Sequence, residues 1–122
     1  MPAPRAPAKP RSRYGAGRTT GTTRTALLDL PASGTDLPAP KMPAGRAWTL
    51  AERHRWSELW SSPQAVAWDE SCIGTVAILV CYETAVFDGT ASAWQAAELR
   101  HAGEALGLTP RALSMLGWRI VS

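Results

Sequence analysis

The stretch Glu70–Phe87 reads ESCIGTVAILVCYETAVF, and its middle, Val76–Tyr82, is apolar on every side of a helix. Asp69 precedes it and can cap a helix. A helix that is apolar all round must be buried on most sides. The residues Ile73, Thr75, Val76, Ile78 and Val80 are β-branched and Gly74 weakens a helix, so a strand competes. We favour a helix, because no other part expected to be ordered offers a partner strand.

Other helices are predicted on both sides of this stretch. Thr49 and Glu52 have the spacing of a capping box, which starts a helix that runs to about Trp60. A short turn over 63–67, a helix over about 91–106 that ends at Gly107, and a last helix from Thr109-Pro110 to Leu116 follow. The sequence therefore predicts an all-α fold, a small helical domain of three to four helices.

Residues 1–47 differ sharply in composition from the remainder. They hold 8 of the 10 prolines and carry eight Lys or Arg against two Asp, a net charge of +6. Residues 48–122 carry five Arg against eight acids, a net charge of −3. A proline-rich segment with little apolar content cannot offset its ordering entropy. We expect a disordered basic arm at 1–47 and a helical oligomerisation domain at 48–122.

Several functional classes are disfavoured by what the chain contains. The acids are scattered, and no Ser or Cys has a His in a recognisable catalytic setting, so we expect no enzyme and no catalytic residues. Zinc-ligand spacing is missing, and Cys72 and Cys81 are expected to be reduced core residues. We therefore expect no metal and no cofactor. Without a run of eighteen apolar residues or a secretory signal, we expect no membrane span and a cytoplasmic location.

Six tryptophans are more than a body of about 75 residues is expected to bury by itself. Some of this apolar surface should therefore lie between subunits. We take Trp56, Trp60 and Trp94 as candidate oligomer-interface residues. The alternative is a self-contained core that is rich in tryptophan.

Two features could bind nucleic acid. In the arm, arginines can pair with phosphate and a tyrosine can stack on a base, which gives as candidate DNA-binding residues, on charge alone, Arg11, Arg13, Arg18, Arg24 and Tyr14. The second feature is Leu99–Trp118, which has the spacing of a helix-turn-helix, with Gly103 at a close helix crossing and Gly107 at the turn. Its outward side chains, Arg111 among them, are poor base readers, so an ordinary helix–Gly–helix corner remains the favoured alternative.

The order of several short motifs resembles that of a known family. The relevant segments are Gly45-Arg46-Ala47-Trp48, Trp56-Ser57-Glu58-Leu59-Trp60-Ser61-Ser62-Pro63-Gln64-Ala65, Trp68-Asp69, Ala97-Glu98-Leu99-Arg100, Leu106-Gly107-Leu108-Thr109-Pro110-Arg111-Ala112 and Leu116-Gly117-Trp118-Arg119-Ile120. Together they resemble the small subunit of phage terminases, in particular the type encoded by phages and prophages of actinobacteria. The resemblance covers about residues 47–121.

The resemblance implies a regulatory role without an active site in viral genome packaging. Small subunits of this family assemble into homo-oligomeric rings, engage double-stranded viral DNA and act with the terminase large subunit, which holds the ATPase and nuclease. Many relatives carry an N-terminal helix-turn-helix, and residues 1–47 do not fit one. Two other functions stay open, a small helix-turn-helix regulator and a structural or connector protein of the virion.

Overall fold

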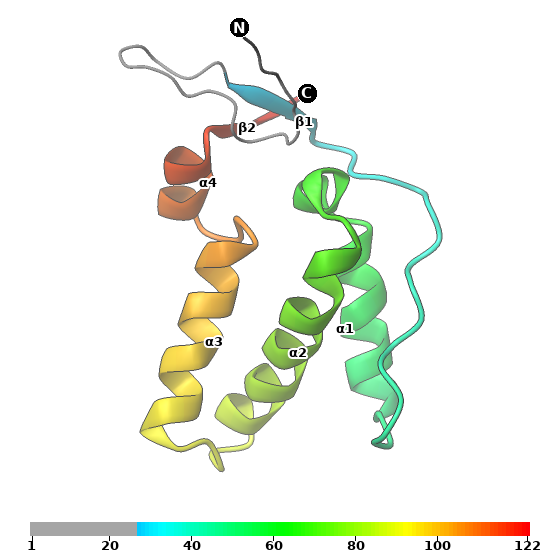
Figure 1. Cartoon of the computed structure of the whole chain (residues 1–122), viewed down its shortest axis with the longest axis vertical. Coiled ribbons are helices and arrows are strands. Elements are labelled where there is room, and N and C mark those ends of the chain that lie inside the picture. Colours follow the sequence, from blue (N-terminus) through cyan, green and yellow to red (C-terminus); the bar gives the residue numbers. More distant parts are fainter. Residues whose placement is uncertain (1–26) are drawn as a thin grey trace, which may run out of the picture.

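The computed structural model describes residues 27–122, which form a mostly helical domain with one small sheet (Figure 1). The predicted fold class is confirmed, and the described residues form four α-helices. In chain order the elements are strand β1 (Leu28–Pro31), helix α1 (Leu50–Trp60), the 3-10 turns η1 (Pro63–Ala67) and η2 (Glu70–Cys72), helices α2 (Ile73–Phe87), α3 (Ala93–Ala105) and α4 (Pro110–Leu116), and strand β2 (Trp118–Val121).

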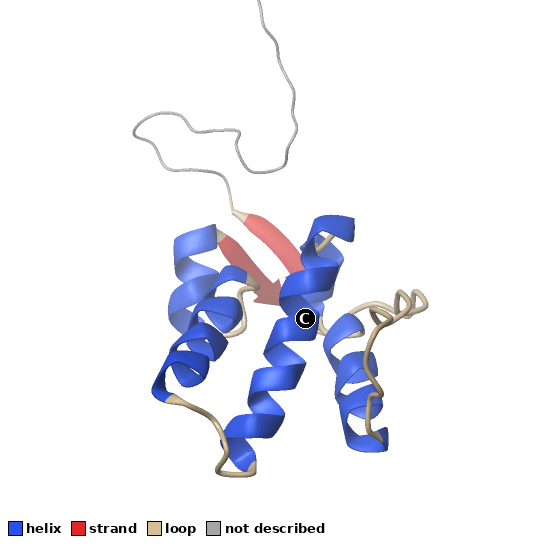
Figure 2. Cartoon of the chain, turned by 60° about the horizontal axis from the view of Figure 1, so that its bottom comes forward, coloured by secondary structure: helices blue, strands red, loops and turns tan. Residues whose placement is uncertain are grey.

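The three longer helices lie side by side in a single layer, with α2 in the middle (Figures 1 and 2). Helix α2 packs against α1 on one side and against α3 on the other. The strands lie across one end of this layer, beside α4. Within residues 27–122 no second layer of helices lies over α2, and Ile78 on this helix remains exposed (Figure 1).

The helix boundaries follow the capping residues. Thr49 and Glu52 form the predicted capping box at the start of α1. Ser92 and Gln95 form a second capping box at the start of α3, which the sequence analysis missed. Glu70–Phe87 is helical as predicted, although its first three residues, capped by Asp69, form the 3-10 turn η2.

The two strands pair in parallel, and they come from opposite ends of the described chain. The register places Leu28 opposite Trp118 and Leu30 opposite Ile120. Leu30 is fully buried, and the exposed ion pair between Arg119 and Asp29 spans the two strands. The segment that follows Leu116 therefore packs on the body of this chain.

The predicted boundary at residue 47 is wrong for the part of the arm that the structure describes. Residues 27–47 contain β1 and then run along α1 to the start of that helix (Figure 1). The carbonyl of Pro40 accepts a 2.8 Å hydrogen bond from the Trp56 indole, and that of Pro43 accepts one from Trp48. Prolines lack a donor but keep this acceptor, so a proline-rich segment can still be fixed by side chains. Residues 1–26 lie outside the described residues.

Tryptophan side chains fill the core near the sheet. Trp60 packs between Trp56 and Trp68, with ring centroids 5.8 and 5.1 Å away. The Trp68 indole donates to the carbonyl of Leu106, and Trp118 of β2 joins the same cluster. These four rings are buried within a single chain. For these four tryptophans the alternative of a self-contained, tryptophan-rich core is therefore the correct one.

The turn between α3 and α4 depends on Gly107. Its φ of +76° disfavours other residues, and a Cβ at this position would lie 2.4 Å from the Trp118 ring. Gly103, which we expected at a close helix crossing, has no atom within 4 Å of the corresponding position. The glycine that matters for this corner is therefore the one at the turn.

One helical stretch, Glu70–Phe87, is long and apolar enough to cross a membrane by length and composition alone. The core helix of a water-soluble protein meets the same criteria, so this is weak support for a span. The expectation of no membrane span stays a prediction.

Candidate functional site: an apolar pocket beside a buried ion pair

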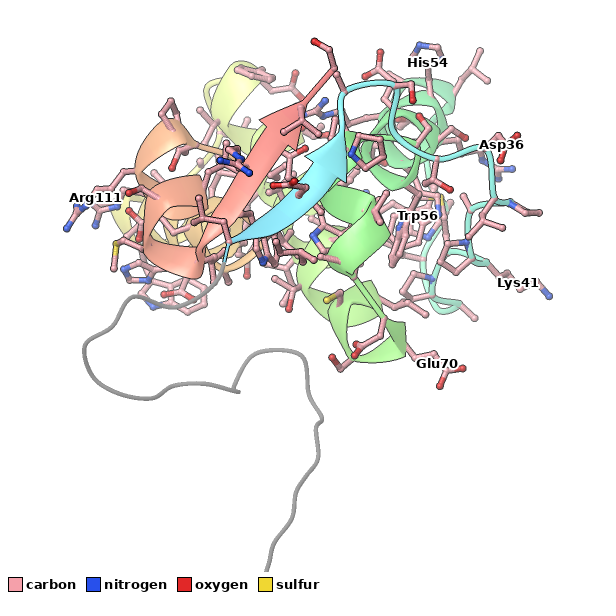
Figure 3. All side chains as sticks on the ribbon, turned by 90° about the horizontal axis from the view of Figure 1, so that it is seen from above. Asp36, Lys41, His54, Trp56, Glu70 and Arg111 are labelled. Atoms are coloured by element: carbon pink, nitrogen blue, oxygen red, sulfur yellow. The ribbon has the colours of Figure 1, made fainter. Side chains whose placement is uncertain are left out.

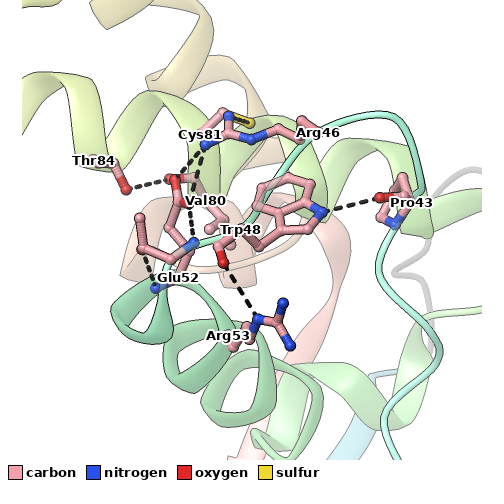
Figure 4. A network of polar contacts seen from close by, with 9 residues as sticks. Pro43, Arg46, Trp48, Glu52, Arg53, Val80, Cys81 and Thr84 are labelled. Carbon is pink, nitrogen blue, oxygen red and sulfur yellow. Dashed lines mark hydrogen bonds and ion pairs between the residues drawn. The ribbon is translucent and has the colours of Figure 1, made fainter.

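A buried carboxylate anchors the loop before α1 to the body (Figure 4). Glu52 is 2% exposed, and both its oxygens accept hydrogen bonds from the same Arg46 nitrogen at 3.0 Å. One of these oxygens also accepts from the backbone of Thr49. The Arg46 guanidinium stacks on Trp48, 4.3 Å from the ring centroid, and donates to the Cys81 sulfur at 2.9 Å. This network joins the loop, α1 and α2.

The network also changes the acidity of two of its members. Burial by itself raises the pKa of Glu52, but hydrogen bonds from Thr49 and Thr84 and the charge of Arg46 outweigh it, so the pKa is lowered. Burial raises the pKa of Cys81 despite the neighbouring guanidinium. Glu52 is therefore held as a carboxylate, and Cys81 is held as a thiol.

An apolar pocket of about 370 Å³ lies between this loop and α2. Trp48 and the loop residues before it form one wall. Ile78 and Cys81 belong to the α2 wall, together with Tyr82. The full lining consists of Pro43, Ala44, Gly45, Arg46, Trp48, Ala77, Ile78, Cys81 and Tyr82. The pocket is thus an apolar concavity with a guanidinium as its one strongly charged lining group.

The apolar surface continues from the pocket onto α3. Tyr82 meets Trp94 edge to face, with the ring centroids 6.1 Å apart. Trp94 is 63% exposed, and Ile78 in the pocket wall is also exposed. Exposed aromatic and aliphatic groups that adjoin a concavity are typical of a surface that binds another protein.

The predicted interface residues fall into two groups. Trp56 and Trp60 are 3% and 8% exposed, so the prediction that they form an oligomer interface is wrong for this structure (Figure 3 labels Trp56). Their burial against the Pro40 carbonyl and against one another leaves no surface for a neighbour. Trp94 lies on the exposed apolar surface, where an interface residue is expected.

The predicted DNA-binding residues cannot be placed. Arg11, Arg13, Arg18, Arg24 and Tyr14 all lie outside the described residues. The possible helix-turn-helix is present as α3, a turn at Gly107 and the seven-residue α4. Arg111 on α4 is exposed (Figure 3), and its exposed neighbours Ser114 and Met115 offer little for reading bases.

The pocket was not predicted from the sequence, nor was the place of Arg46 among its lining residues. The pocket joins a loop to a helix about 30 residues later, and no local spacing pattern links them. One signal was available: Arg46 and Trp48 directly precede the capping box, so they had to lie beside the start of α1.

Within residues 27–122, no three His, Cys, Asp or Glu side chains are grouped so that they could hold a metal ion. Comparison with known proteins places no further constraint on the site. No protein-family model, curated protein or solved structure matches the chain.

Proposed function

We propose that this protein is a terminase small subunit, a regulatory protein without an active site that acts in viral genome packaging. In this role it binds double-stranded viral DNA, forms a homo-oligomeric ring and acts with the large subunit that carries the ATPase and nuclease. The sequence resemblance over about residues 47–121 supports the assignment. Within the structure, the observation that carries it is the uncovered apolar surface of the pocket and Trp94.

This surface supports self-association because a small domain that leaves a pocket and aromatic side chains uncovered gains free energy by burying them against a neighbour. The basic residues 1–47 support DNA binding, because Lys and Arg release counterions when they meet phosphates. A virion connector would need self-association alone. A helix-turn-helix regulator would need DNA binding, with Arg111 as the contact to DNA.

The proposal is tested by DNA binding of the full chain, measured by fluorescence anisotropy over a range of salt concentrations. We expect the variant with glutamine at the four arm arginines to bind more weakly, because four phosphate contacts are lost. Its log–log salt slope should fall by about 3 to 4. The four positions are Arg11, Arg13, Arg18 and Arg24.

Arg111→Gln is the matched control, since it removes one exposed positive charge from the body and should change the slope by about 1 or less. If Arg111→Glu abolishes binding while the arm variant binds normally, the regulator replaces our proposal. An oligomer without DNA affinity would instead favour the connector. Purified large subunit added to the wild-type oligomer should co-elute with it in gel filtration.

A further inference from the structure

One seven-residue motif occurs twice in the sequence, and the structure describes the second occurrence. Residues 38–44 read PAPKMPA, and residues 2–8 read PAPRAPA. Five of the seven positions are identical, and a sixth keeps its positive charge as Lys41 or Arg5. Residues 2–8 lie outside the described residues, so the contacts made by residues 38–44 show what this motif can bind.

Residues 38–44 are held against α1 by two tryptophans (Figure 1). The Trp56 indole donates to the Pro40 carbonyl at 2.8 Å, and the Trp48 indole donates to the Pro43 carbonyl at 2.9 Å. Paired indole donors of this kind suit a proline-rich segment, which is extended before it binds and therefore loses little conformational entropy. We call the surface formed by these two indoles the α1 site.

Residues 2–8 carry the same two acceptors. Pro4 and Pro7 stand at the positions of Pro40 and Pro43, so the two carbonyls have the same spacing along the chain. The hydrogen bonds to the indoles use backbone oxygens, which the two occurrences of the motif share in full. The α1 site therefore accepts either segment as far as its hydrogen bonds are concerned.

The two positions that differ explain which segment holds the site in the structure. Lys41 is exposed, so the longer guanidinium of Arg5 fits in its place. Met42 is half-buried and packs against the core, whereas residues 2–8 offer Ala6 there. The smaller side chain buries less apolar surface, which should weaken docking about tenfold. Residues 38–44 are therefore the favoured occupant.

Residues 2–8 can reach the α1 site of their own chain. The 18 residues 9–26 separate them from the described part and span at most about 60 Å when extended. Helix α1 is only about 16 Å long. Attachment to the same chain also gives a segment an effective concentration in the millimolar range, which a separate molecule rarely matches.

We propose that residues 2–8 are a second occupant of the α1 site, in exchange with residues 38–44 of the same chain. In the exchanged state, Trp56 donates to Pro4 and Trp48 donates to Pro7. Docking then closes residues 9–26 into a loop that is fixed at both ends. The four arginines proposed to bind DNA lie in this loop, a consequence that rests on the proposed function, whereas the docking itself does not.

A swap of the two differing apolar residues tests the exchange in the full-length protein. The double variant Met42→Ala/Ala6→Met should shift the ratio of the two occupants about 100-fold towards residues 2–8, because each substitution contributes about tenfold. Nuclear Overhauser effects from the Trp56 indole N–H report the occupant. We expect contacts to Pro40 in the wild type and contacts mainly to Pro4 in the swapped variant.

The matched control is Met42→Ala/Ala16→Met, which makes the same change in residues 38–44 but places the new methionine outside the motif. It should show Pro40 and Pro4 contacts of similar strength. Ala6→Met alone leaves every described residue unchanged and should also make the two occupants about equal. This single variant keeps the test valid if Met42→Ala fails to fold.

Contacts to Pro40 alone in both Met42→Ala/Ala6→Met and Ala6→Met would overturn the proposal. A mixture of labelled and unlabelled chains identifies the source of the occupant. If the Pro4 contacts arise between a labelled and an unlabelled chain, the occupant comes from a second copy and the exchange within one chain is wrong. Neither result changes the salt-dependent DNA binding that tests the proposed function.

Discussion

The two ends of the helical layer treat the same residue types in opposite ways. At the end beside the sheet, Trp60 and Trp68 are enclosed by other rings, and their neighbours include a fully buried leucine. Along the pocket and the far end of α2 and α3, Trp94 and Phe87 remain largely exposed. Aromatic content alone therefore does not distinguish a core from an interface. The difference lies in which side chains receive a partner from the same chain.

We expect the largest loss of stability from Trp68→Ala. This change removes a buried ring, its edge-to-face contact with Trp60 and its hydrogen bond to Leu106. We expect the free energy of unfolding to fall by about 3–5 kcal/mol. Urea denaturation of the full chain measures it, at a low and constant protein concentration so that association does not differ between variants.

Trp94→Ala, measured in the same way, is the matched control. It should lower the free energy of unfolding by about 1 kcal/mol or less, because it loses little beyond the contact with Tyr82. Equal losses at the two positions would contradict the division of the molecule into an enclosed and an open region.

Gly107→Ala should lower the free energy of unfolding by a smaller amount, about 2–3 kcal/mol. Alanine is strained at a φ of +76°, and its Cβ would overlap the Trp118 ring that closes the enclosed region. Gly117→Ala provides the control, since Gly117 has a similar φ of +73° and open space around it. The difference between their unfolding free energies measures the packing of Trp118. A difference near zero would show that the ring moves aside freely.

The smallest effect concerns Glu52, which lies between the two regions. Its pKa in the folded chain is below the ordinary value of 4.5, so its contribution to stability is complete above that pH. The contribution is lost as the pH falls through the lowered pKa. We expect the stability difference between wild type and Glu52→Gln to be constant from pH 6 to 7 and to shrink below pH 4.5.

Denaturation at a series of pH values checks this expectation, with Glu58→Gln as the control because Glu58 is an exposed residue on the same helix. A difference between wild type and Glu52→Gln that grows as the pH falls would contradict the assigned direction of the shift.

The helices could be predicted because their determinants are local. Thr49 and Asp69 cap the segments that we expected them to cap, and Thr109 precedes the last helix as expected. The sheet could not be predicted, since each strand has four residues and its partner lies about 90 residues away. Pro31 in β1 also argued for disorder. The folded part of the arm was missed for a related reason, because it is held by tryptophan indoles that bind proline carbonyls.

The candidate site was predicted less well than the fold. The number of tryptophans suggested uncovered apolar surface, but four of the rings are buried in the chain itself. Trp94 is exposed, and its place in an interface stays a prediction. Trp56 and Trp60 were chosen because they share one face of a helix, a pattern that core and interface residues have in common. Only the path of residues 32–48 along α1 shows that this chain covers the face itself.

The parallel pairing of Leu28–Pro31 with Trp118–Val121 has a consequence for biosynthesis. The first strand leaves the ribosome about 90 residues ahead of its partner. Until then Leu30 has no neighbouring strand, and Trp118 is missing from the tryptophan cluster. Helices α1 to α3 can form on the nascent chain, but the sheet and its share of the core cannot close until Trp118–Val121 has left the ribosome. A chain that stops before Trp118 would therefore expose the apolar surface that chaperones and proteases recognise.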